Sequence, residues 1–438
     1  MNLFTYKTFS YHQINQILVE RWSTLRRKLI SIPLIILAIF LVIIIRLLRP
    51  FLIIRIDAVD VGRIGGPYHV NYYYLNEKAA GQHRVRYFDL FYFIESTNHV
   101  NRQWEKMWKR VLPVFPWPKL ARFVERINNW FSGQEVHQIP KFDVIPTKKE
   151  HVSYLEGRNL KVYSKYNQRL ECTFGSSQSN LSFTEAEEAR GEKEIQQLGI
   201  PLDSPFICFH NRDSVFLDAA LDNFDWKYHN YRDSSIQNYL NAAEEMARRG
   251  CYAVRLGAKV KDKVKSVNPK VIKYACNGMR SDFLDIYLSA KCRFILCSDT
   301  GISLPAEVFK RPLVFVNWTM PLRVPVYIDH CLVIFKKFYL KNENRFMTFS
   351  EIMNLEFGGR DTNRIFTSLN LELIENTPEE ISAVTIEMDE RINGTWNIIE
   401  EDVKLQQRFW DLFGPAKLKS PDFWIGAEYL RDNQELLK

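Results

Sequence analysis

The sequence lacks the residue clusters by which metal sites and several common catalytic centres are recognised. Its seven cysteines form no CxxC pair and no Cys/His cluster at zinc spacing, and HExxH, P-loop and GxSxG motifs are missing. We therefore expect no metal and no cofactor. An odd cysteine count without a framework spacing favours buried, reduced thiols over a disulfide-stapled secreted fold.

The sequence also lacks low-complexity tracts, a fixed-period repeat and a strong excess of one charge. Of its 438 residues, 46% are hydrophobic and 25% are charged, which is typical of globular proteins. The net charge of +8 favours anionic partners but does not indicate nucleic acid, and we expect none. The length predicts two domains with additional segments.

One long hydrophobic run stands near the N-terminus, LISIPLIILAIFLVIIIRLL (residues 29–48), and Arg46 is its only charge. Twenty residues at 1.5 Å each reach about 30 Å, the thickness of the hydrocarbon layer. We favour a retained transmembrane helix or hydrophobic anchor, while a signal peptide or a buried helix is the alternative. Arginines and lysines flank both ends, so charge does not settle the orientation.

The next segments are typical of an α/β domain. FLIIRI (51–56) predicts a strand that leads into the glycine-rich loop DAVDVGRIGGP (57–67), and YYYLNE (72–77) and YFDLFYFIES (87–96) predict further strands. Residues 98–146 are basic and rich in tryptophan. They suit a lipid headgroup interface, or the aromatic residues pack inside the first domain and the charges face solvent.

From residue 206 onward, apolar strands alternate with helices. TEAEEARGEKEIQQLGIP (184–201) predicts a charged helix before this series, with Thr184 as N-cap and Glu187 at the N3 position. FICF, YAVRL, VIKY, RFILC and LVFV predict strands, and helices are expected near 235–249 and 281–290. NTPEEI predicts another helix start, with Thr377 as N-cap, Pro378 at N1 and Glu380 at N3. This order predicts a parallel sheet that binds ligands at the carboxyl ends of its strands.

Several polar residues at these strand ends are candidates for an anion site. Ser298, Asp299, Thr300 and Gly301 form a turn between a strand and a helix, where backbone N–H groups and the helix dipole can hold an anion. Arg212 can bind a diphosphate with two hydrogen bonds, or it forms a salt bridge with Asp213 or Asp233. His210 is either a site residue or the end of a strand, and Asp233 is either a helix cap or a ligand contact.

Three further residues have two interpretations each. Arg280 precedes a helix start capped by Ser281, and it is also able to reach the anion. Asp57 and Asp60 flank the glycine-rich loop, where each is either a general base for an acceptor hydroxyl or a turn-forming residue.

These motifs resemble a known family. SDFLDIYLSAKCRFILCSDTGISLPAEVFKRPLVFVN (281–317) resembles the donor-binding half of GT-B glycosyltransferases, above all the heptosyltransferase type, and CFHNRDS (208–214) resembles the H-x-R segment of the fucosyltransferase type. A group of bacterial glycosyltransferases carries segments similar to LRPFLIIRIDAVDVGRIGG and YHNYRDSSIQNYL, over roughly residues 49–396.

The resemblance implies roles for individual residues. Arg212 would bind the donor diphosphate, Ser298 to Gly301 would cradle it, and the loop 57–66 would border the acceptor. Heptosyltransferases carry Gly-Asp in that loop, whereas Val61 and Gly62 follow Asp60 here, so Asp57 and Asp60 both stay candidates for the base. Asp299 and Glu307 are spaced like the glutamate pair of retaining enzymes, but the flanking pattern differs and we favour inversion.

The resemblance also implies a fold and a location. We expect a GT-B-like α/β fold with two Rossmann-like domains, divided as an anchor segment (1–50), an acceptor domain (51–200), a nucleotide-sugar domain (201–345) and a helical extension (346–438). A sugar would pass from a nucleotide-diphosphate donor to a glycan or lipid-linked acceptor. The enzyme would sit at the inner (cytoplasmic) membrane of a bacterial cell, facing the cytoplasm. An epimerase-like GT-B enzyme and a non-catalytic membrane scaffold are the alternatives.

Overall fold

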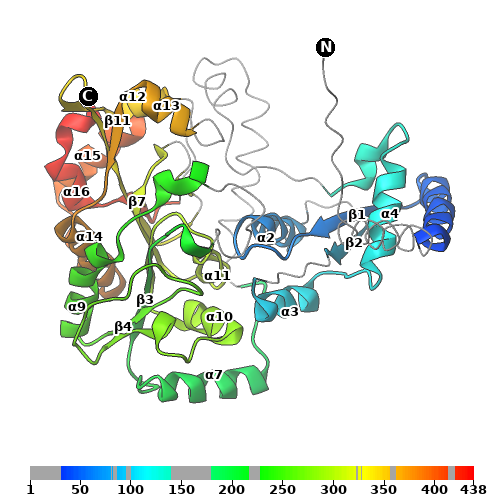
Figure 1. The fold of residues 1–438 in the computed structure, drawn as a ribbon, viewed down its shortest axis with the longest axis horizontal. Coiled ribbons are helices and arrows are strands. Elements are labelled where there is room, and N and C mark those ends of the chain that lie inside the picture. The colour runs from blue at the N-terminus through cyan, green and yellow to red at the C-terminus, as the bar shows by residue number, and fades with distance from the viewer. Residues whose placement is uncertain are drawn as a thin grey trace, which may run out of the picture. The chain divides into compact units, whose positions relative to one another are not determined.

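The computed structural model describes residues 31–79, 81, 86–94, 100–139, 179–216, 227–321, 324–326, 328–355, 362–412 and 420–438. The chain forms two compact units (Figure 1). The first unit comprises Met1–Asp60, His83–Glu95 and Leu112–Pro140, and the second comprises Val61–Gln82, Ser96–Val111 and Lys141–Lys438. The domain boundaries expected from the sequence stay a prediction.

The first unit is built on two parallel strands, β1 (Ile53–Val59) and β2 (Tyr87–Phe93). Arg55 lies opposite Asp89 in the register, and its guanidinium donates two hydrogen bonds of 2.5 and 2.7 Å to that carboxylate. Both side chains are buried, so each charge needs the other. The helix α4 (Pro118–Asn128) and the short helix η1 (Gln134–His137) also belong to this unit.

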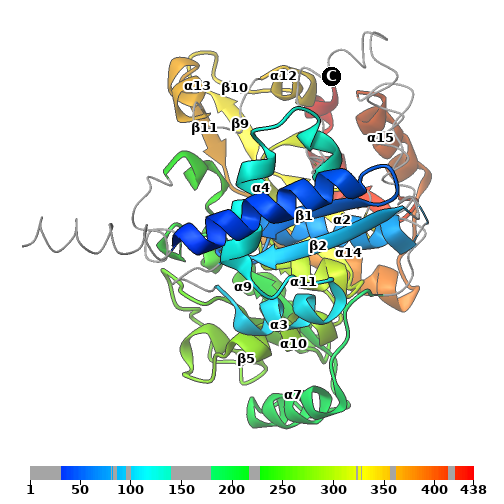
Figure 2. The same ribbon diagram turned by 90° about the vertical axis from the view of Figure 1, so that its right-hand side faces the viewer.

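The apolar helix Ser31–Leu48 packs on one side against this framework (Figure 2). Ala38, Val42 and Ile45 form a buried cluster with Leu120, Val124 and Ile127 of α4. The helix has a mean hydropathy of 2.9, and only 17% of it is buried. By length and composition it is able to cross a membrane, as the sequence predicts.

The second unit contains a seven-stranded sheet in the order β12-β8-β7-β6-β3-β4-β5, and every pair of neighbours is parallel. This confirms the predicted α/β class with a parallel sheet. The strands are β3 (Phe206–His210), β4 (Tyr252–Arg255), β5 (Val271–Ile272), β6 (Ile295–Cys297), β7 (Leu313–Trp318), β8 (Cys331–Phe335) and β12 (Phe423–Ile425). A smaller antiparallel sheet contains β9 (Lys337–Leu340), β10 (Arg345–Phe346) and β11 (Leu371–Ile374).

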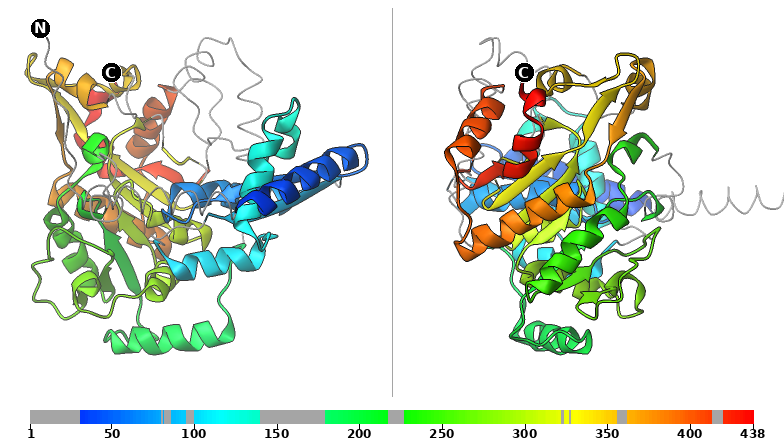
Figure 3. Two further views of the ribbon diagram at one scale, coloured as in Figure 1. Left: turned by 45° about the vertical axis from the view of Figure 1, so that its right-hand side comes forward. Right: turned by 90° about the vertical axis from the view of Figure 1, so that its left-hand side faces the viewer.

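Helices cover the large sheet, and α9 (Leu240–Arg248) and α14 (Pro378–Asn393) lie side by side (Figure 1). Figure 3 shows α14, in orange, lying along the yellow and green strands. The other helices are α2 (Gly66–Ala79), α3 (Arg102–Val111), α7 (Glu185–Gln197), α10 (Asp282–Lys291), α11 (Ser303–Val308), α12 (Phe349–Met353), α13 (Thr362–Ser368), α15 (Glu400–Asp411), α16 (Ala427–Asp432), η2 (Lys227–Arg232), η3 (Ile236–Tyr239), η4 (Tyr274–Cys276) and η6 (Gln434–Leu437).

The predicted helix starts are confirmed by their caps. Thr184 and Glu187 form a reciprocal capping box at the start of α7, and Thr377 and Glu380 form one at the start of α14. The Ser281 hydroxyl accepts a hydrogen bond from the Leu284 amide at the start of α10. Each cap satisfies amides that the first helical turn leaves without partners.

The tryptophan-rich region divides into buried and exposed parts. Trp104 and Trp108 of α3 are fully buried and pack on Tyr68 of α2, with ring centroids 5.9 and 5.7 Å from the tyrosine ring. Trp117 and Trp130, in the first unit, are 64% and 78% exposed. Internal packing therefore explains α3, and the lipid-interface interpretation applies only to the exposed aromatic residues. The part of this region from residue 140 onward lies outside the described residues.

Two other predictions are corrected. The segment Tyr72–Glu77 is not a strand but lies inside the helix α2. Of the cysteines, Cys208, Cys251, Cys292, Cys297 and Cys331 are buried and free as predicted, whereas Cys276 is exposed and Cys172 lies outside the described residues.

Candidate anion-binding site

Arg212 stands at the carboxyl end of β3, in the second unit. Its backbone N–H donates a hydrogen bond of 2.8 Å to the hydroxyl oxygen of Ser298, the first residue after β6. Strands β3 and β6 are parallel neighbours, with His210 opposite Cys297. The structure therefore brings together the two segments that the sequence separately predicts to bind an anion.

The Arg212 guanidinium is buried and only partly satisfied. Its side chain is 7% exposed, and Nη1 donates to the carboxylate of Asp233. Nη2 is buried and has no hydrogen-bond partner within the described residues. The salt bridge to Asp233 is thus present, but a guanidinium has five N–H donors, and a buried donor without a partner is costly. The unsatisfied side of Arg212 indicates an anionic ligand.

Two more cations, which the sequence analysis missed, lie beside Arg212. Arg232 ends η2, donates to Asp299 at 3.2 Å, and has a buried Nε without a hydrogen-bond partner in the described part of the chain. Lys336 follows β8 and is 4% exposed, and its Nζ donates to the carbonyl oxygens of Tyr231 and Asp233. Because both of these partners are neutral, they do not balance the charge of Lys336.

Burial, and in part the neighbouring cations, lower the pKa values of several basic groups at this site. Burial, helped by Arg232, lowers the pKa of Arg212 to about 10. Burial lowers the pKa of Lys336 to about 8; Glu375 opposes this shift and Arg212 adds to it. Burial and then Arg232 and Arg212 lower the pKa of His229 to about 4. An anion bound among these groups would offset their repulsion and raise all three pKa values.

The turn Ser298–Gly301 contributes less helix dipole than the sequence predicts. The helix after it, α11, has only six residues, and its first amides, those of Ser303 and Leu304, donate to the carbonyl oxygens of Thr300 and Gly301 at 3.3 Å. The Thr300 carbonyl also accepts from the Ser303 hydroxyl at 2.8 Å. The side chains of Arg212, Arg232 and Lys336 therefore supply most of the positive charge.

Gly301 lies against the glycine-rich loop. A Cβ atom on Gly301 would lie 3.0 Å from the Gly65 nitrogen and 3.1 Å from Ile64 Cγ2, closer than side chains normally pack. The second half of the predicted loop, from Val61, belongs to the same unit as the turn. Only glycine permits this approach of the two backbones.

His210 and its neighbours position the end of β3. The Nδ1 atom of His210 lies 3.0 Å from the Leu256 carbonyl oxygen and 2.8 Å from Arg255 Nη1. Burial and the adjacent Arg255 lower the pKa of His210 to about 3, so its ring is neutral at physiological pH. Arg255 also donates to the Asn211 side-chain oxygen at 2.6 Å. His210 is therefore suited to hold Asn211 and Arg212 in place rather than to transfer protons.

Arg280 forms salt bridges with two carboxylates of α10. It donates to Asp285 at 2.7 Å and to Asp282 at 3.0 Å, and no contact in the described chain joins it to Arg212. The structure does not bring Arg280 to the three cations.

Asp57 and Asp60 belong to the first unit. Asp57 is 4% exposed within β1 and its carboxylate accepts a hydrogen bond from the Ala58 amide at 2.8 Å, whereas Asp60 is exposed just after the strand. A proton acceptor has to meet its substrate, so exposure favours Asp60. Its role as general base stays a prediction.

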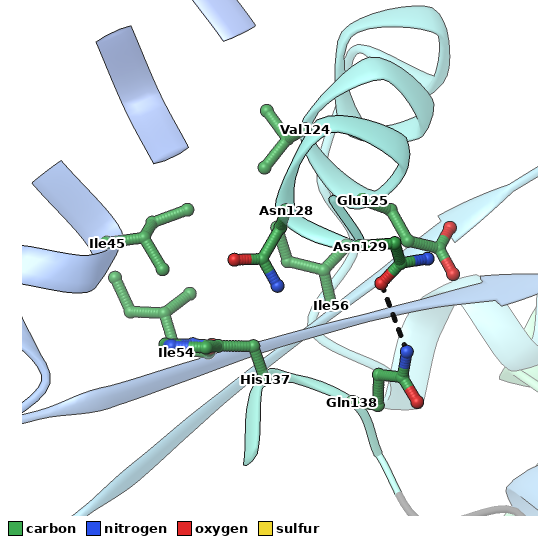
Figure 4. Close-up of a pocket in the computed structure, with 9 residues that line it drawn as sticks. All are labelled: Ile45, Ile54, Ile56, Val124, Glu125, Asn128, Asn129, His137 and Gln138. Carbon is green, nitrogen blue, oxygen red and sulfur yellow. Dashed lines mark hydrogen bonds between the residues drawn. The ribbon is translucent and has the colours of Figure 1, made fainter. Parts of the chain in front are cut away.

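The described residues contain no group of three or more His, Cys, Asp or Glu side chains able to hold a metal ion. They contain a cavity of about 10 Å³ in the first unit, lined by Ile45, Val124 and His137 among others (Figure 4). A cavity of that volume has room for about one water molecule, and a substrate would not fit.

No protein-family model and no curated protein matches this chain. Among solved structures, it is similar to a glycosyl transferase family 9 protein of Veillonella parvula, with 11% identity, a TM-score of 0.38, and 78% of this chain and 97% of that chain covered. It is similar to ADP-heptose LPS heptosyltransferase II of E. coli, with 13% identity, a TM-score of 0.38, and 72% and 98% covered. A protein described as a UDP-N-acetylglucosamine 2-epimerase of Listeria monocytogenes has 12% identity, a TM-score of 0.20, and 60% and 56% covered.

Proposed function

We propose that this chain is a membrane-associated glycosyltransferase that transfers a sugar from a nucleoside-diphosphate donor to a glycan or lipid-linked acceptor. The observation that carries the proposal is the group of three cations formed by the buried Arg212 and Lys336, at the carboxyl ends of β3 and β8, and the partly buried Arg232 of η2. Unsatisfied N–H donors on Arg212 and Arg232 need an acceptor, and a diphosphate supplies several charged oxygens. The likeness of the motifs to GT-B donor domains supports the same ligand.

The three cations suit the chemistry of a leaving diphosphate. In direct displacement, the acceptor oxygen forms a bond to the anomeric carbon while the bond from that carbon to the diphosphate oxygen breaks. The diphosphate keeps the electron pair, and Arg212, Arg232 and Lys336 would stabilise its growing charge. Asp60, or Asp57, would take the proton of the acceptor hydroxyl. This route inverts the anomeric centre and assigns no role to a metal.

The apolar helix Ser31–Leu48 supports the association with a membrane. Nucleotide sugars are made in the cytosol, so the donor site would face the cytoplasm, at the inner membrane of a bacterial cell. A lipid-linked acceptor would then be delivered by the same membrane that holds the enzyme.

The test is a thermal-shift screen of the full chain in detergent against GDP, UDP, ADP, dTDP and CMP. A nucleotide at one hundred times its Kd should stabilise the protein by about 2.7 kcal/mol. Arg212→Ala should weaken its binding by about 2–5 kcal/mol. Arg293→Ala is the control, because this arginine also pairs with an aspartate, Asp389, and its side chain is 22% exposed against 7% for Arg212.

The outcomes separate the alternatives. One nucleotide that stabilises the wild type and the control, but not Arg212→Ala, supports a donor site. No shift with any nucleotide, in a protein that melts cooperatively, favours a non-catalytic scaffold. If the matching nucleotide sugar is converted to an isomer without any acceptor, the chain is an epimerase.

A further inference from the structure

The exposed side of the apolar helix Ser31–Leu48 is entirely apolar. Residues 36, 40, 43 and 47 follow helical spacing, and Ile36, Phe40, Ile43 and Leu47 are 62%, 59%, 51% and 72% exposed. Ile32, Leu37 and Ile39 flank this strip and are also exposed. A continuous apolar strip of this length is far more than the scattered exposed apolar residues of an ordinary protein surface.

The other side of the helix belongs to the core of the first unit. Contacts with α4 and β1 run from Leu34 to Ile45, which is about 17 Å along the helix axis. Ile45 of the helix lines the cavity of about 10 Å³ together with Val124 and His137 (Figure 4). The Arg46 guanidinium fastens the end of the helix, since it donates to the Asn128 side-chain oxygen at 2.8 Å and to the Ser132 carbonyl.

This packing conflicts with a helix that crosses the bilayer. The stripe of α4 that contacts the apolar helix is formed by Leu120, Val124 and Ile127, while Lys119, Arg122 and Arg126 are exposed on another side of α4. If the apolar helix stood upright in the membrane, α4, which packs against Ala38, Val42 and Ile45 of that helix, would lie at the depth of the hydrocarbon. Three basic side chains would then enter the hydrocarbon, at a cost of a few kcal/mol each.

The surroundings of the strip fit a lipid headgroup layer. Phe131 is 47% exposed and its ring lies 5.1 Å from the Arg46 guanidinium carbon, and Trp130 beside it is 78% exposed. At the other side of the cluster, the exposed Trp117 packs edge-on against Phe115, which contacts the same core. Aromatic rings and arginines next to an apolar strip are typical of proteins that lie in the membrane interface.

We propose that the apolar helix lies in the plane of one leaflet, with the strip Ile36–Phe40–Ile43–Leu47 inserted among the acyl chains and without crossing the bilayer. Its partner is a leaflet that contains anionic lipid, because Arg46 and the exposed Arg49 stand at the end of the strip. The inference rests on the membrane association proposed above, but not on glycosyl transfer.

The depth of the helix in a bilayer tests the proposal. Single cysteines replace Ile36, Phe40, Ile43 and Leu47 in turn, in a background with Cys276→Ser, which removes the exposed thiol of the described residues, and Cys172→Ser, which removes the cysteine outside them. Each variant of the full chain is spin-labelled and reconstituted into vesicles of phosphatidylcholine and phosphatidylglycerol, and the depth of each label is measured by power-saturation EPR. Insertion in the plane predicts nearly equal depths for the four labels.

A helix that crosses the bilayer gives a different result. Residues 36 and 47 would differ by about 17 Å along the membrane normal, and such a gradient would overturn the proposal while leaving membrane association intact. Failure of the protein to bind vesicles, together with dimers in solution, would show that a second copy covers the strip. That result would overturn both the in-plane proposal and the membrane part of the proposed function.

Vesicle flotation tests the same proposal independently of the EPR depths. Phe40→Asp should weaken vesicle binding at least tenfold, because it places a charge in the middle of the strip. Val403→Asp is the matched control, since this valine is 50% exposed on α15 of the second unit. Equal binding by wild type and Phe40→Asp would contradict the proposal, and nucleotide thermal shifts on the same variants show whether the donor site is intact.

Discussion

Gly65 and Gly301 meet backbone to backbone, and a Cβ atom on Gly65 would lie 2.7 Å from the Gly301 Cα. Neither residue has a left-handed conformation, so close approach alone explains the need for glycine here. The contact fixes the glycine-rich loop against the turn that follows β6, next to the three cations.

Gly65→Ala tests this contact. At a position with room for a Cβ atom, a change from glycine to alanine stabilises the fold by about 0.4–1 kcal/mol, because it lowers the conformational entropy of the unfolded chain. Here we expect the free energy of unfolding to fall by about 1–3 kcal/mol, because backbone atoms of Gly301 have to move. Urea denaturation measures the difference, and Thr300→Ala, which adds no atom to the turn, is the control. An increase in stability would show that the two glycines do not touch.

The affinity for nucleoside diphosphate should depend on pH through Lys336. Its pKa of about 8 lies below the usual 10.5, so the side chain loses its proton as the pH rises through 8. The diphosphate binds the charged form, so we expect affinity to fall by up to about tenfold per pH unit above 8 and binding near pH 8 to take up a proton.

Calorimetry in buffers of different ionisation enthalpy measures that proton. Lys336→Gln should bind weakly and lose the pH dependence. Lys337→Gln, at the neighbouring lysine that pairs with Glu380, should keep it. A wild-type affinity that is constant from pH 7 to 9 would argue against a diphosphate beside Lys336.

Arg280→Ala should lower stability without affecting the nucleotide. Asp285 is 4% exposed, and Arg280 is its cationic partner at 2.7 Å. Because Arg280 is itself 27% exposed and partly screened, we expect a loss of about 1–3 kcal/mol, below the value for a fully buried pair. Urea denaturation gives the loss, and the thermal-shift screen gives nucleotide binding. Lost binding at unchanged stability would instead place Arg280 at the anion, as one interpretation of the sequence holds.

Glu187 should stabilise the second unit in a pH-dependent way. Burial alone would raise its pKa, but hydrogen bonds from Gln103, Lys106, Arg110 and the Thr184 amide outweigh burial and lower it to about 2. A folded pKa below that of the unfolded chain means that the stabilisation is complete above about pH 4.5 and lost as the pH falls toward 2.

Glu187→Gln measures this contribution. The stability difference from wild type should be largest above pH 4.5 and should shrink as the pH is lowered. The same change at Glu185, an exposed residue of the same helix, should have little effect at any pH. A difference that does not vary with pH would mean that hydrogen bonds, not charge, account for the role of Glu187.

The repeating strands and helices of the second unit were predictable because short buried strands and capped helices leave local signals. Thr184, Ser281 and Thr377 mark helix starts by residue type alone. The helix α2 was missed because three tyrosines in a row favour a strand. Pro67 at its second position and the four-residue spacing of Tyr68 and Tyr72, both buried, were the signals for a helix.

The anion site was only partly predictable. Arg212 and Ser298 each follow a recognisable strand, so the rule for parallel sheets placed them together. Lys336 was missed because the run CLVIF (331–335) was not recognised as a strand, although its residue types fit one. Arg232 lies on a short helix, and only tertiary packing carries it to Asp299.

The strand β12 pairs with β8 and forms one edge of the sheet, so this edge strand comes from residues 423–425, near the end of the chain. While the ribosome makes residues 336–422, which takes several seconds at about 5–20 residues per second, the edge of β8 has no partner. That edge belongs to CLVIF, five apolar residues that offer a template for pairing with another chain. The nascent protein is therefore most prone to aggregate late in its synthesis, and a stop codon shortly before Phe423 should yield inclusion bodies.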